Sequence, residues 1–243
     1  MSLADKTAVV VGGGTGIGLG IARCLAATGC RVAIAGRREA VLQQSAASWQ
    51  GPVPMICYTV DVARRDSVIA LADWAERELG HIDILVCSAG INIRTRSMAE
   101  MQPDQWDDVM AVNATGTYNC FYAFVPNMRK RGDGLIVNIS SVAGKRASML
   151  AGIAYSAAKF AATGLGMAVG REEGERGIRV TNIYPGEVET PILDQRPVPV
   201  SQEHRQRILQ PEDIGQLVVA IASLPPRAHV PELVIKPVWQ EYV

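Results

Sequence analysis

The 243-residue sequence predicts an α/β fold in which a parallel β-sheet is covered by helices on both faces. Short β-branched segments alternate along the chain with longer segments whose apolar residues recur at helical spacing. Hydrophobic residues make up 48% of the chain, enough apolar material for one large core. The length suits a single domain over residues 1–243 that carries every binding site.

The first half of the chain predicts three repeats of strand and helix. Residues 7–11 form an apolar run bounded by glycines, which predicts a buried strand. Apolar residues at helical spacing follow from Ile17 to Thr28, and Gly29 suits the C′ position of that helix. Further strands are expected over 31–35, 53–60 and 82–87, and further helices over 38–49 and 66–79, the latter with Asp66 as its N-cap.

The second half continues the alternation. A long helix is expected over 103–128, with Pro103 in its first turn. The remaining predicted strands cover 135–139, 178–183 and 232–235, and the remaining helices cover 152–170 and 211–223. Residues 191–210 are the least regular segment. Because loops beyond the carboxyl ends of strands border the ligand crevice in such sheets, we expect this segment near a substrate.

Composition excludes several classes of function. The 24 basic and 24 acidic residues balance, and no basic stripe suggests a nucleic-acid partner. No apolar run is long enough to span a membrane, and the N-terminus lacks a signal-peptide pattern. The five cysteines lack paired spacing, so we expect reduced core residues in a cytoplasmic protein. The three histidines lie far apart, so no metal site is expected.

A glycine-rich segment follows the first strand and opens the first helix. Glycines let a phosphate approach the backbone, and the N–H groups of the helix N-terminus attract the anion. The context predicts a Rossmann-like, doubly wound sheet that binds a dinucleotide through Gly12, Gly14, Thr15, Gly16, Ile17 and Gly18. Asp61, after the third strand, could accept a hydrogen bond from adenine or cap the next helix, and the sequence leaves both readings open.

Six short motifs, in order along nearly the whole chain, resemble those of the short-chain dehydrogenase/reductase family. They are the glycine loop 11–18, Cys87-Ser88-Ala89-Gly90, Asn113, Ser141, Tyr155-x-x-x-Lys159, and Pro185-Gly186-Glu187-Val188-Glu189-Thr190. Val11 stands where the family has threonine, and Cys87-Ser88 replaces two asparagines. The run 224–230 and the tail around Trp239 also depart from the family pattern.

The resemblance implies a sheet of about seven strands in the order 3-2-1-4-5-6-7 and a catalytic tetrad of Asn113, Ser141, Tyr155 and Lys159. Asn113 would support a water that relays protons to Lys159, and Lys159 would also contact the nicotinamide ribose. Thr190 would hold the nicotinamide carboxamide. Further cofactor contacts are implied for Val62, Ser88, Ala89, Gly90, Pro185, Gly186 and Val188.

Tyr155 and Lys159 also carry a chemical argument of their own. Reduction of a carbonyl needs a proton donor on the oxygen, and the reverse reaction needs a base there. Four residues apart on a helix, the two side chains share one face, and the ammonium group favours the phenolate. Singly, such a pair is usually a solvated helix face, and Ser140-Ser141 usually a cap or turn. Because these residues occur together at the spacings of the family, we favour the catalytic interpretation.

The residues after the second strand bear on the choice of cofactor. An acidic residue there would bind both ribose hydroxyls and repel a 2′-phosphate. This chain has Gly36-Arg37-Arg38, and two guanidinium groups suit a phosphate, so NADP(H) is favoured and NAD(H) is the alternative. Against this, Gly14-Thr15 stands where many phosphate-selective relatives carry a further basic residue.

The sequence thus predicts an oxidoreductase that transfers hydride between NAD(P)(H) and a small carbonyl or alcohol. Residues 91–98, 145–153 and 191–210 would select the substrate. The alternatives are an enoyl-thioester reductase, with Arg94, Arg96 and Arg146 as candidates for a basic mouth, and a catalytically silent nucleotide-binding regulator.

A homotetramer, or a homodimer, is also expected. The family commonly pairs the two long helices with their copies in a partner. Gly164, Gly166 and Gly170 would give the second helix a small-residue surface that permits close contact, and Trp239 and Tyr242 could serve a second interface.

Overall fold

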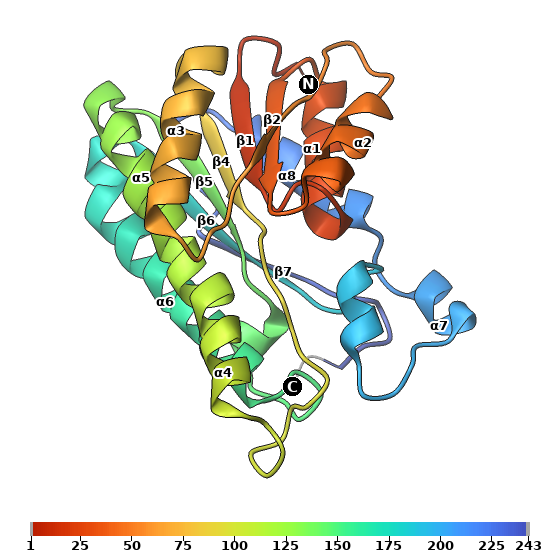
Figure 1. Ribbon diagram of the computed structural model, residues 1–243. Coiled ribbons are helices and arrows are strands. Elements are labelled where there is room, and N and C mark those ends of the chain that lie inside the picture. The colour runs from red at the N-terminus through yellow and green to blue at the C-terminus, as the bar shows by residue number, and fades with distance from the viewer. Residues whose placement is uncertain (1, 242–243) are drawn as a thin grey trace.

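The computed structural model describes residues 2–241, within which the strands form one parallel seven-stranded sheet (Figure 1). Its order is β3-β2-β1-β4-β5-β6-β7, which confirms the predicted fold class and strand order. The strands are β1 (Thr7–Val11), β2 (Arg31–Gly36), β3 (Ile56–Thr59), β4 (Ile84–Cys87), β5 (Gly134–Ile139), β6 (Ile178–Pro185) and β7 (Glu232–Ile235).

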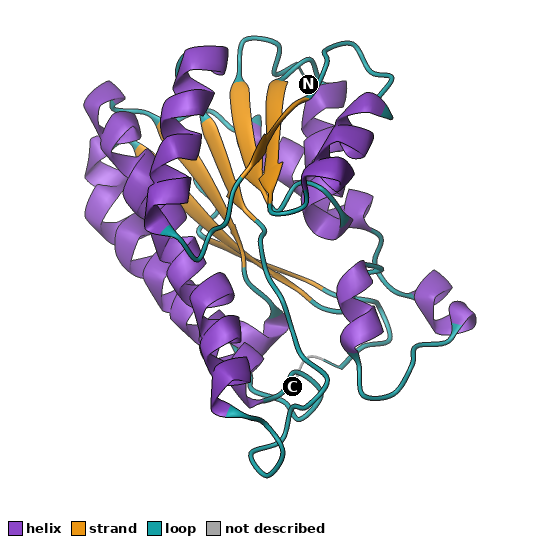
Figure 2. Cartoon of the chain, viewed as in Figure 1, coloured by secondary structure: helices purple, strands orange, loops and turns teal. Residues whose placement is uncertain are grey.

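Helices cover both faces of this sheet (Figure 2). The α-helices are α1 (Gly16–Ala27), α2 (Glu39–Ala47), α3 (Arg65–Leu79), α4 (Pro103–Met110), α5 (Gly116–Arg131), α6 (Ile153–Glu173), α7 (Gln202–Arg207) and α8 (Pro211–Ala222). A π-helical turn, η1 (Ala111–Thr115), joins α4 to α5, and the 3₁₀ turns are η2 (Val142–Gly144), η3 (Gly174–Arg176) and η4 (Pro191–Gln195). Helices α1, α2 and α8 pack on one face of the sheet, and α3, α5 and α6 on the other.

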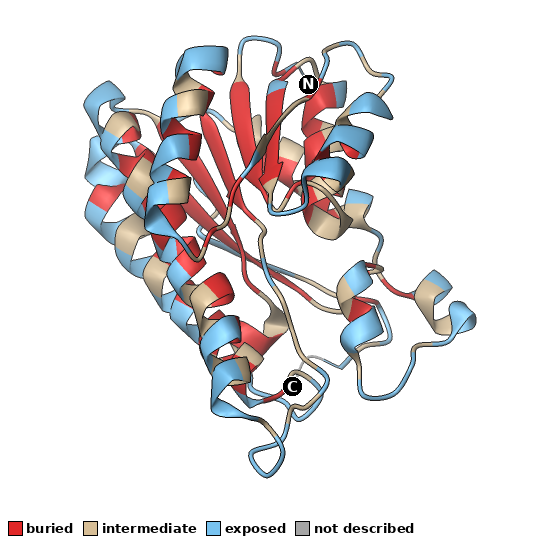
Figure 3. Cartoon of the chain, viewed as in Figure 1, coloured by how far each residue is buried: buried red, intermediate tan, exposed pale blue. Residues whose placement is uncertain are grey.

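The strands at the centre are buried on both faces, as Figure 3 shows in red. In β1, Val9 and Val11 pack into the core under α3 and α5, whereas Ala8 and Val10 pack into the core under α1 and α8. This alternation explains why the strand reads as a continuous apolar run. Gly29 has a φ of 90° just beyond the C-cap of α1, as predicted for its C′ position.

The structure corrects several predicted boundaries. The third strand spans only Ile56–Thr59, because the chain enters it through a loop in which Val53 O accepts a hydrogen bond from Trp49 Nε1. The fourth strand begins at Ile84 rather than residue 82. Asp66 is not an N-cap: α3 has Arg64 at that position, and Asp66 lies in the first turn, where its Oδ1 accepts from Ser67 N at 2.9 Å.

Two longer segments also differ from expectation. The helix predicted over 103–128 is interrupted by η1, and the irregular segment 191–210 contains η4 and α7. The small-residue surface of α6 is only partly open. A Cβ at Gly164 would meet no atom within 4 Å, whereas one at Gly166 would lie 2.1 Å from Asn182 Oδ1, and one at Gly170 3.3 Å from Val180 Cβ. The prediction of a shared open face is therefore wrong for Gly166 and Gly170, which face the sheet.

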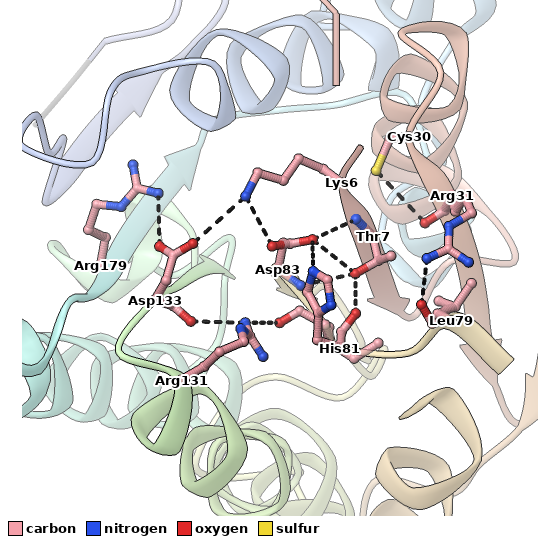
Figure 4. A network of polar contacts seen from close by, with 11 residues as sticks. Lys6, Thr7, Cys30, Arg31, Leu79, His81, Asp83, Arg131, Asp133 and Arg179 are labelled. Carbon is pink, nitrogen blue, oxygen red and sulfur yellow. Dashed lines mark hydrogen bonds and ion pairs between the residues drawn. The ribbon is translucent and has the colours of Figure 1, made fainter. Parts of the chain in front are cut away.

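A polar network closes the amino edge of the sheet, where β1, β4 and β5 begin (Figure 4). Asp83, only 5% exposed, accepts hydrogen bonds from Thr7 N at 2.9 Å, Lys6 Nζ at 3.0 Å and Thr7 Oγ1 at 3.1 Å. Burial acts to raise the pKa of Asp83, but the hydrogen bonds from Thr7 and Lys6 outweigh it, so the pKa lies below its ordinary value.

Candidate active site

The glycine loop lies between β1 and α1 and brings two segments of backbone unusually close together. Gly12 has a φ of 83°, and a Cβ there would lie 2.5 Å from Ala89 N, so only glycine fits. A Cβ at Gly18 would lie 2.2 Å from Gly12 O. The loop keeps its backbone bonds without the family's threonine: Ser88 N donates to Val11 O at 2.8 Å, and Gly12 N donates to Ala35 O at 2.7 Å.

The N-terminus of α1 is suited to an anion. Thr15 is its N-cap, but the Thr15 side chain accepts no hydrogen bond from the helix. The first N–H groups of an α-helix have no partner within the helix, so a ligand phosphate can accept from them. Arg38 Nη2 lies 3.3 Å from Thr15 Oγ1 and adds positive charge beside this position.

A groove of about 780 Å³ runs from this loop to Tyr155 along the carboxyl ends of the strands. Its glycine floor leaves room for a pyrophosphate, and its volume suits a dinucleotide. Most of the predicted cofactor residues line it: Gly12, Gly14, Thr15, Gly16, Ile17, Gly18, Arg37, Arg38, Val62, Ser88, Ala89, Gly90, Tyr155, Lys159 and Thr190. Thr190 reaches the loop directly, because a Cβ at Gly16 would lie 3.0 Å from its Cγ2.

Four predicted cofactor residues do not line this groove. Asp61 Oδ1 accepts from Ala63 N at 3.1 Å and closes the turn before α3, so its contacts fit the local, structural reading better than the adenine one. Pro185, Gly186 and Val188 instead line a smaller neighbouring cavity. Hydrophobic residues that sequence reasoning missed, Val41, Leu42, Val60 and Val112, complete the walls of the groove.

Tyr155 and Lys159 lie on α6, one turn apart, as their spacing predicts. The Lys159 Nζ atom lies 5.6 Å from the centroid of the Tyr155 ring and donates to Ile139 O at 2.8 Å. Lys159 is only 5% exposed, and this burial lowers its pKa to about 8. The pair is therefore not the solvated helix face that was the alternative reading.

Ser141 follows β5 and lies in the same cavity as Tyr155. Burial raises the pKa of Tyr155, while a hydrogen bond with Ser141 and the positive charge of Arg96 both act to lower it. Ser141 Oγ also accepts from Ala143 N at 3.1 Å, so this side chain caps η2 while facing the cavity. Its neighbour Ser140 is mainly structural, with its Oγ 2.9 Å from Thr163 Oγ1.

Asn113 is fully buried within the π-helical turn η1. Its Nδ2 donates to Ile91 O at 2.9 Å, and its Oδ1 accepts from Ile91 N at 2.8 Å. A Cβ at Gly90 would lie 3.5 Å from Asn113 Oδ1 and 3.7 Å from Lys159 Nζ, so these two side chains meet beside the same loop. In this structure Asn113 fixes the backbone that connects the cofactor groove to the substrate side.

The smaller cavity, of about 160 Å³, adjoins the groove at Tyr155. Each of the three segments predicted to select the substrate contributes to it: Asn92 and Arg96 from the first, Ser148 and Leu150 from the second, and Ile192 and Arg196 from the third. Of the three candidate arginines, only Arg96 lines the cavity, whereas Arg94 and Arg146 are exposed and do not.

Sequence reasoning missed two polar residues of this cavity, Glu187 and Gln240, and it singled out the segment that contains Arg196 but not Arg196 itself. Glu187 lies within the family motif, which assigns it no role, and Gln240 belongs to the divergent tail. Gln240 Oε1 accepts from Glu187 N at 3.0 Å, and Trp239 Nε1 donates to Arg207 O at 3.2 Å. The unusual tail therefore packs beside the smaller cavity.

The remaining expectations concern metals, cysteines and membranes. Among residues 2–241, no group of histidine, cysteine and acidic side chains could hold a metal ion. The five cysteines are free thiols, of which Cys30, Cys87 and Cys120 are buried. In the same described part of the chain, every helix is too short or too polar to cross a bilayer.

Comparison with known proteins identifies the family. A model of the short chain dehydrogenase family matches residues 6–198. An uncharacterized oxidoreductase of Staphylococcus saprophyticus is 32% identical over 240 residues, covering 98% of this chain and all of the relative.

Solved structures give the same picture. A serine dehydrogenase solved with NADP⁺ superposes with a TM-score of 0.88 at 26% identity, covering 97% of this chain and 96% of the other. A 3-ketoacyl-(acyl-carrier-protein) reductase of Brucella melitensis, solved with NADH, superposes with a TM-score of 0.87 at 26% identity, covering 98% of this chain and 99% of the other.

These matches span the glycine loop, the strand order and the Tyr155–Lys159 pair, so the resemblance inferred from the motifs is confirmed. The chain belongs to the short-chain dehydrogenase family and is an oxidoreductase that transfers hydride with a nicotinamide cofactor.

Proposed function

We propose that this protein interconverts a small carbonyl compound and its alcohol, with Tyr155 as the acid and base and with NADP(H) preferred to NAD(H). One observation carries the proposal: Tyr155 lines both the long groove and the smaller cavity, so it lies where a cofactor and a substrate would meet.

The side chains around Tyr155 support this chemistry. A bound nicotinamide supplies or accepts the hydride. In reduction Tyr155 donates its phenolic proton to the carbonyl oxygen, and in oxidation it accepts the proton of the alcohol. Its raised pKa keeps the phenol protonated at neutral pH, which suits donation. Ser141 lines the same cavity and is hydrogen-bonded with Tyr155, so it can hydrogen-bond the same substrate oxygen.

Lys159 and Asn113 position this centre. With a pKa of about 8, Lys159 carries a positive charge at neutral pH, which favours the phenolate that forms after proton donation. Asn113 holds Ile91 through both of its side-chain atoms and thereby fixes the loop beside Lys159. A water linking Asn113 to Lys159 belongs to this proposal as the route by which Tyr155 regains its proton.

The preference for NADP(H) rests on the end of the groove beyond β2. Arg37 and Arg38 both line that end, and Arg38 reaches the glycine loop through Thr15. Guanidinium groups bind a phosphate through paired, charge-assisted hydrogen bonds. The serine dehydrogenase neighbour was solved with NADP⁺ and the ketoacyl reductase neighbour with NADH, so relatives of similar fold use either cofactor.

No observation among the described residues favours the other functions considered, enoyl-thioester reduction or a silent nucleotide-binding regulator. All four tetrad residues are present, and Ser141, Tyr155 and Lys159 adjoin the cavities.

The test is Tyr155→Phe, which removes only the hydroxyl group. With NADPH and a panel of small aldehydes and ketones, turnover is expected to fall by about 10²–10⁴-fold, the usual contribution of general acid–base catalysis. Cofactor binding and thermal stability should stay at wild-type values. Tyr58→Phe, in β3 and outside both cavities, is the matched control and should retain full turnover. Wild-type turnover in Tyr155→Phe would show that another group moves the proton.

We also propose that the protein is cytoplasmic and forms a homotetramer or homodimer through α5 and α6. Tyr118 and Tyr122 on α5 and Phe160 and Met167 on α6 are each more than 40% exposed, a large apolar surface for a monomer. Trp239, 45% exposed, supports a second interface, whereas Tyr242 lies outside the described residues. Light scattering tests this: Phe160→Glu should reduce the mass of the assembly, and a monomeric wild type at micromolar concentration would contradict it.

A further inference from the structure

The cavity beside Tyr155 contains more positive than negative charge. Its basic residues are Arg96 and Arg196, and its acidic residue is Glu187. Glu187 is already engaged, because its Oε2 lies 3.0 Å from Arg196 Nη2 and 2.6 Å from His204 Nε2. Arg196 is therefore neutralised within the protein, and the charge that remains in the cavity is that of Arg96.

Backbone carbonyls hold Arg96 in place, and no carboxylate among residues 2–241 forms an ion pair with it. Its Nε donates to Ile93 O at 2.8 Å, its Nη2 to Gln195 O at 2.9 Å, and its Nη1 to Leu150 O. These carbonyls come from all three loops that border the cavity, so they fix the guanidinium plane relative to Tyr155. A carbonyl dipole orients the group but does not cancel its charge, and a guanidinium has five N–H donors, so some remain for a ligand.

The surroundings of Arg96 disfavour its positive charge unless another group compensates that charge. Burial lowers the pKa of Arg96, the charge of Arg196 lowers it further, and only the facing Tyr155 acts in the opposite direction. Arg96 is half-buried, so its charge is only partly solvated, and a carboxylate supplied by the substrate would give it a partner of opposite charge.

We propose that the substrate is a short carboxylic acid bearing the carbonyl or hydroxyl group, and that its carboxylate binds Arg96 while its reactive carbon faces Tyr155 and Ser141. This inference rests on the proposed function and names its substrate class. A cavity of about 160 Å³ suits a compact acid, since a long acyl chain would not fit inside it. The pairing is charge-assisted and orients the substrate as well as binding it.

The experiment compares each acid with its neutral methyl ester. Pyruvate, acetoacetate and levulinate are assayed beside their methyl esters with the full-length protein and NADPH, and the reverse reaction is assayed with the corresponding hydroxy acids and esters. At least one acid should show kcat/KM about tenfold or more above its ester, because a desolvated charge pair contributes that much or more to binding.

Variants then locate the preference. Arg96→Gln should lose most of the kcat/KM for the acid while kcat/KM for a reactive ester changes little, and Arg96→Lys should restore part of the acid activity. Arg94→Gln is the matched control, because Arg94 is exposed and outside the cavity, and its Nη2 donates to Asp194 O at 3.3 Å. If Arg96→Gln fails to fold, Arg196→Gln is the second variant: it leaves Glu187 without its arginine and should weaken the acids but not the esters.

The outcomes separate the two proposals. Reduction of neutral aldehydes, ketones or esters with no preference for any acid would leave the proposed function standing and overturn this inference. An equal loss on acids and esters in Arg96→Gln would also overturn it, because a loop-fixing role alone gives that result. A protein that turns over neither acids nor neutral carbonyls contradicts both.

Discussion

The two edges of the sheet differ in how their charged side chains are paired. At the amino edge, the Asp83 carboxylate receives hydrogen bonds from Thr7 and Lys6, and Lys6 Nζ also lies 3.7 Å from Asp133 (Figure 4). At the carboxyl edge, Lys159 donates to the carbonyl of Ile139 and Arg96 donates to backbone carbonyls, and neither forms an ion pair with a carboxylate of the described chain.

This difference separates stability from function. At the amino edge, the polar groups form hydrogen bonds and ion pairs within the chain. They therefore contribute to the free energy of unfolding whether or not a ligand is bound. At the carboxyl edge, burial lowers the pKa of Lys159 to about 8, so its charge costs the fold free energy, and in the proposed function this charge acts during catalysis. Substitutions at the two edges should therefore have opposite effects.

The largest expected effect is on turnover in Lys159→Met. Loss of the ammonium group removes the charge that favours the phenolate, so kcat should fall by about 10²–10⁴-fold. The pH profile of any residual oxidation should shift to higher pH, because the Tyr155 phenol then ionises less readily. Steady-state kinetics over a pH series measures both. An unchanged kcat would show that Lys159 plays no part in the proton transfer.

The next largest effect is on stability, at the opposite edge. Asp83→Ala removes a buried carboxylate and leaves Thr7 N–H without an acceptor, so the free energy of unfolding should fall by about 3 kcal/mol. Asp133→Ala, whose side chain is 40% exposed, is the control and should cost about 1 kcal/mol or less. Denaturant titration measures both. Turnover per folded molecule should be unaffected in each variant.

The Asp83 network also predicts how the stability of the protein depends on pH under acidic conditions. The folded-state pKa of Asp83 is lowered, so its stabilising contribution is present above the ordinary carboxyl pKa and is lost as pH falls through the folded value. The stability gap between wild type and Asp83→Ala should therefore narrow below about pH 4. A gap that is constant down to the pH of acid unfolding would contradict the proposed ionised network.

A smaller effect, of opposite sign, is expected for the stability of Lys159→Met. Lowering the lysine pKa from 10.5 to about 8 costs the fold about 3 kcal/mol at neutral pH. The substitution also leaves Ile139 O without its donor, which costs about 1 kcal/mol. The free energy of unfolding is therefore expected to rise by about 1–2 kcal/mol in Lys159→Met.

The sign of the pH dependence follows from proton binding. Between about pH 8 and the ordinary lysine pKa, the unfolded chain binds more protons, so wild-type stability should rise with pH there. Lys159→Met should lack this rise. Calorimetry across that pH range measures the change in stability. If wild-type stability falls or stays constant there, the pKa of Lys159 is not lowered by burial.

The smallest predicted effect concerns the exposed rim of the carboxyl edge. Arg37→Ala should weaken the binding of NADPH by about tenfold and leave the binding of NADH almost unchanged. The effect is small because a solvent-exposed phosphate contact contributes less than a buried one. Arg23→Ala, away from the groove, is the control. Dissociation constants from cofactor fluorescence decide the point. A wild type that binds NADH more tightly, or an Arg37→Ala variant that keeps its preference, would refute the assignment.

The features that the sequence predicts well are local. The glycine loop and the Tyr155–Lys159 pair each lie within one turn or one helix, so spacing alone places their groups on a common surface. Alternating strands and helices also determine the sheet, because crossover connections leave few possible topologies. The network around Asp83 was not foreseen, since it joins residues 76 or more positions apart.

The substrate cavity could not be predicted in the same way. The sequence names Arg96 and the segment of Arg196 as candidates, but these residues meet Glu187 and Gln240 only through the conformations of separate segments, which residue spacing does not determine. Asp66 illustrates the limit at short range: an acidic residue before a helix suggests an N-cap, yet the helix begins one residue earlier with Arg64 as its cap. The π-helical turn has no distinctive composition.

That turn, η1, has a consequence for which changes of length the chain can tolerate. Before it, α4 packs through Val109 against Ala154 and Ala158 of α6, and after it, α5 packs Phe121 and Phe124 into the core under the sheet. Each residue of an α-helix advances it by about 100°, so the wider turn sets the phase between these two contact faces. Removing one residue from η1 would rotate one face away from its partner. Evolution can therefore exchange side chains along this helix more easily than it can insert or delete a residue.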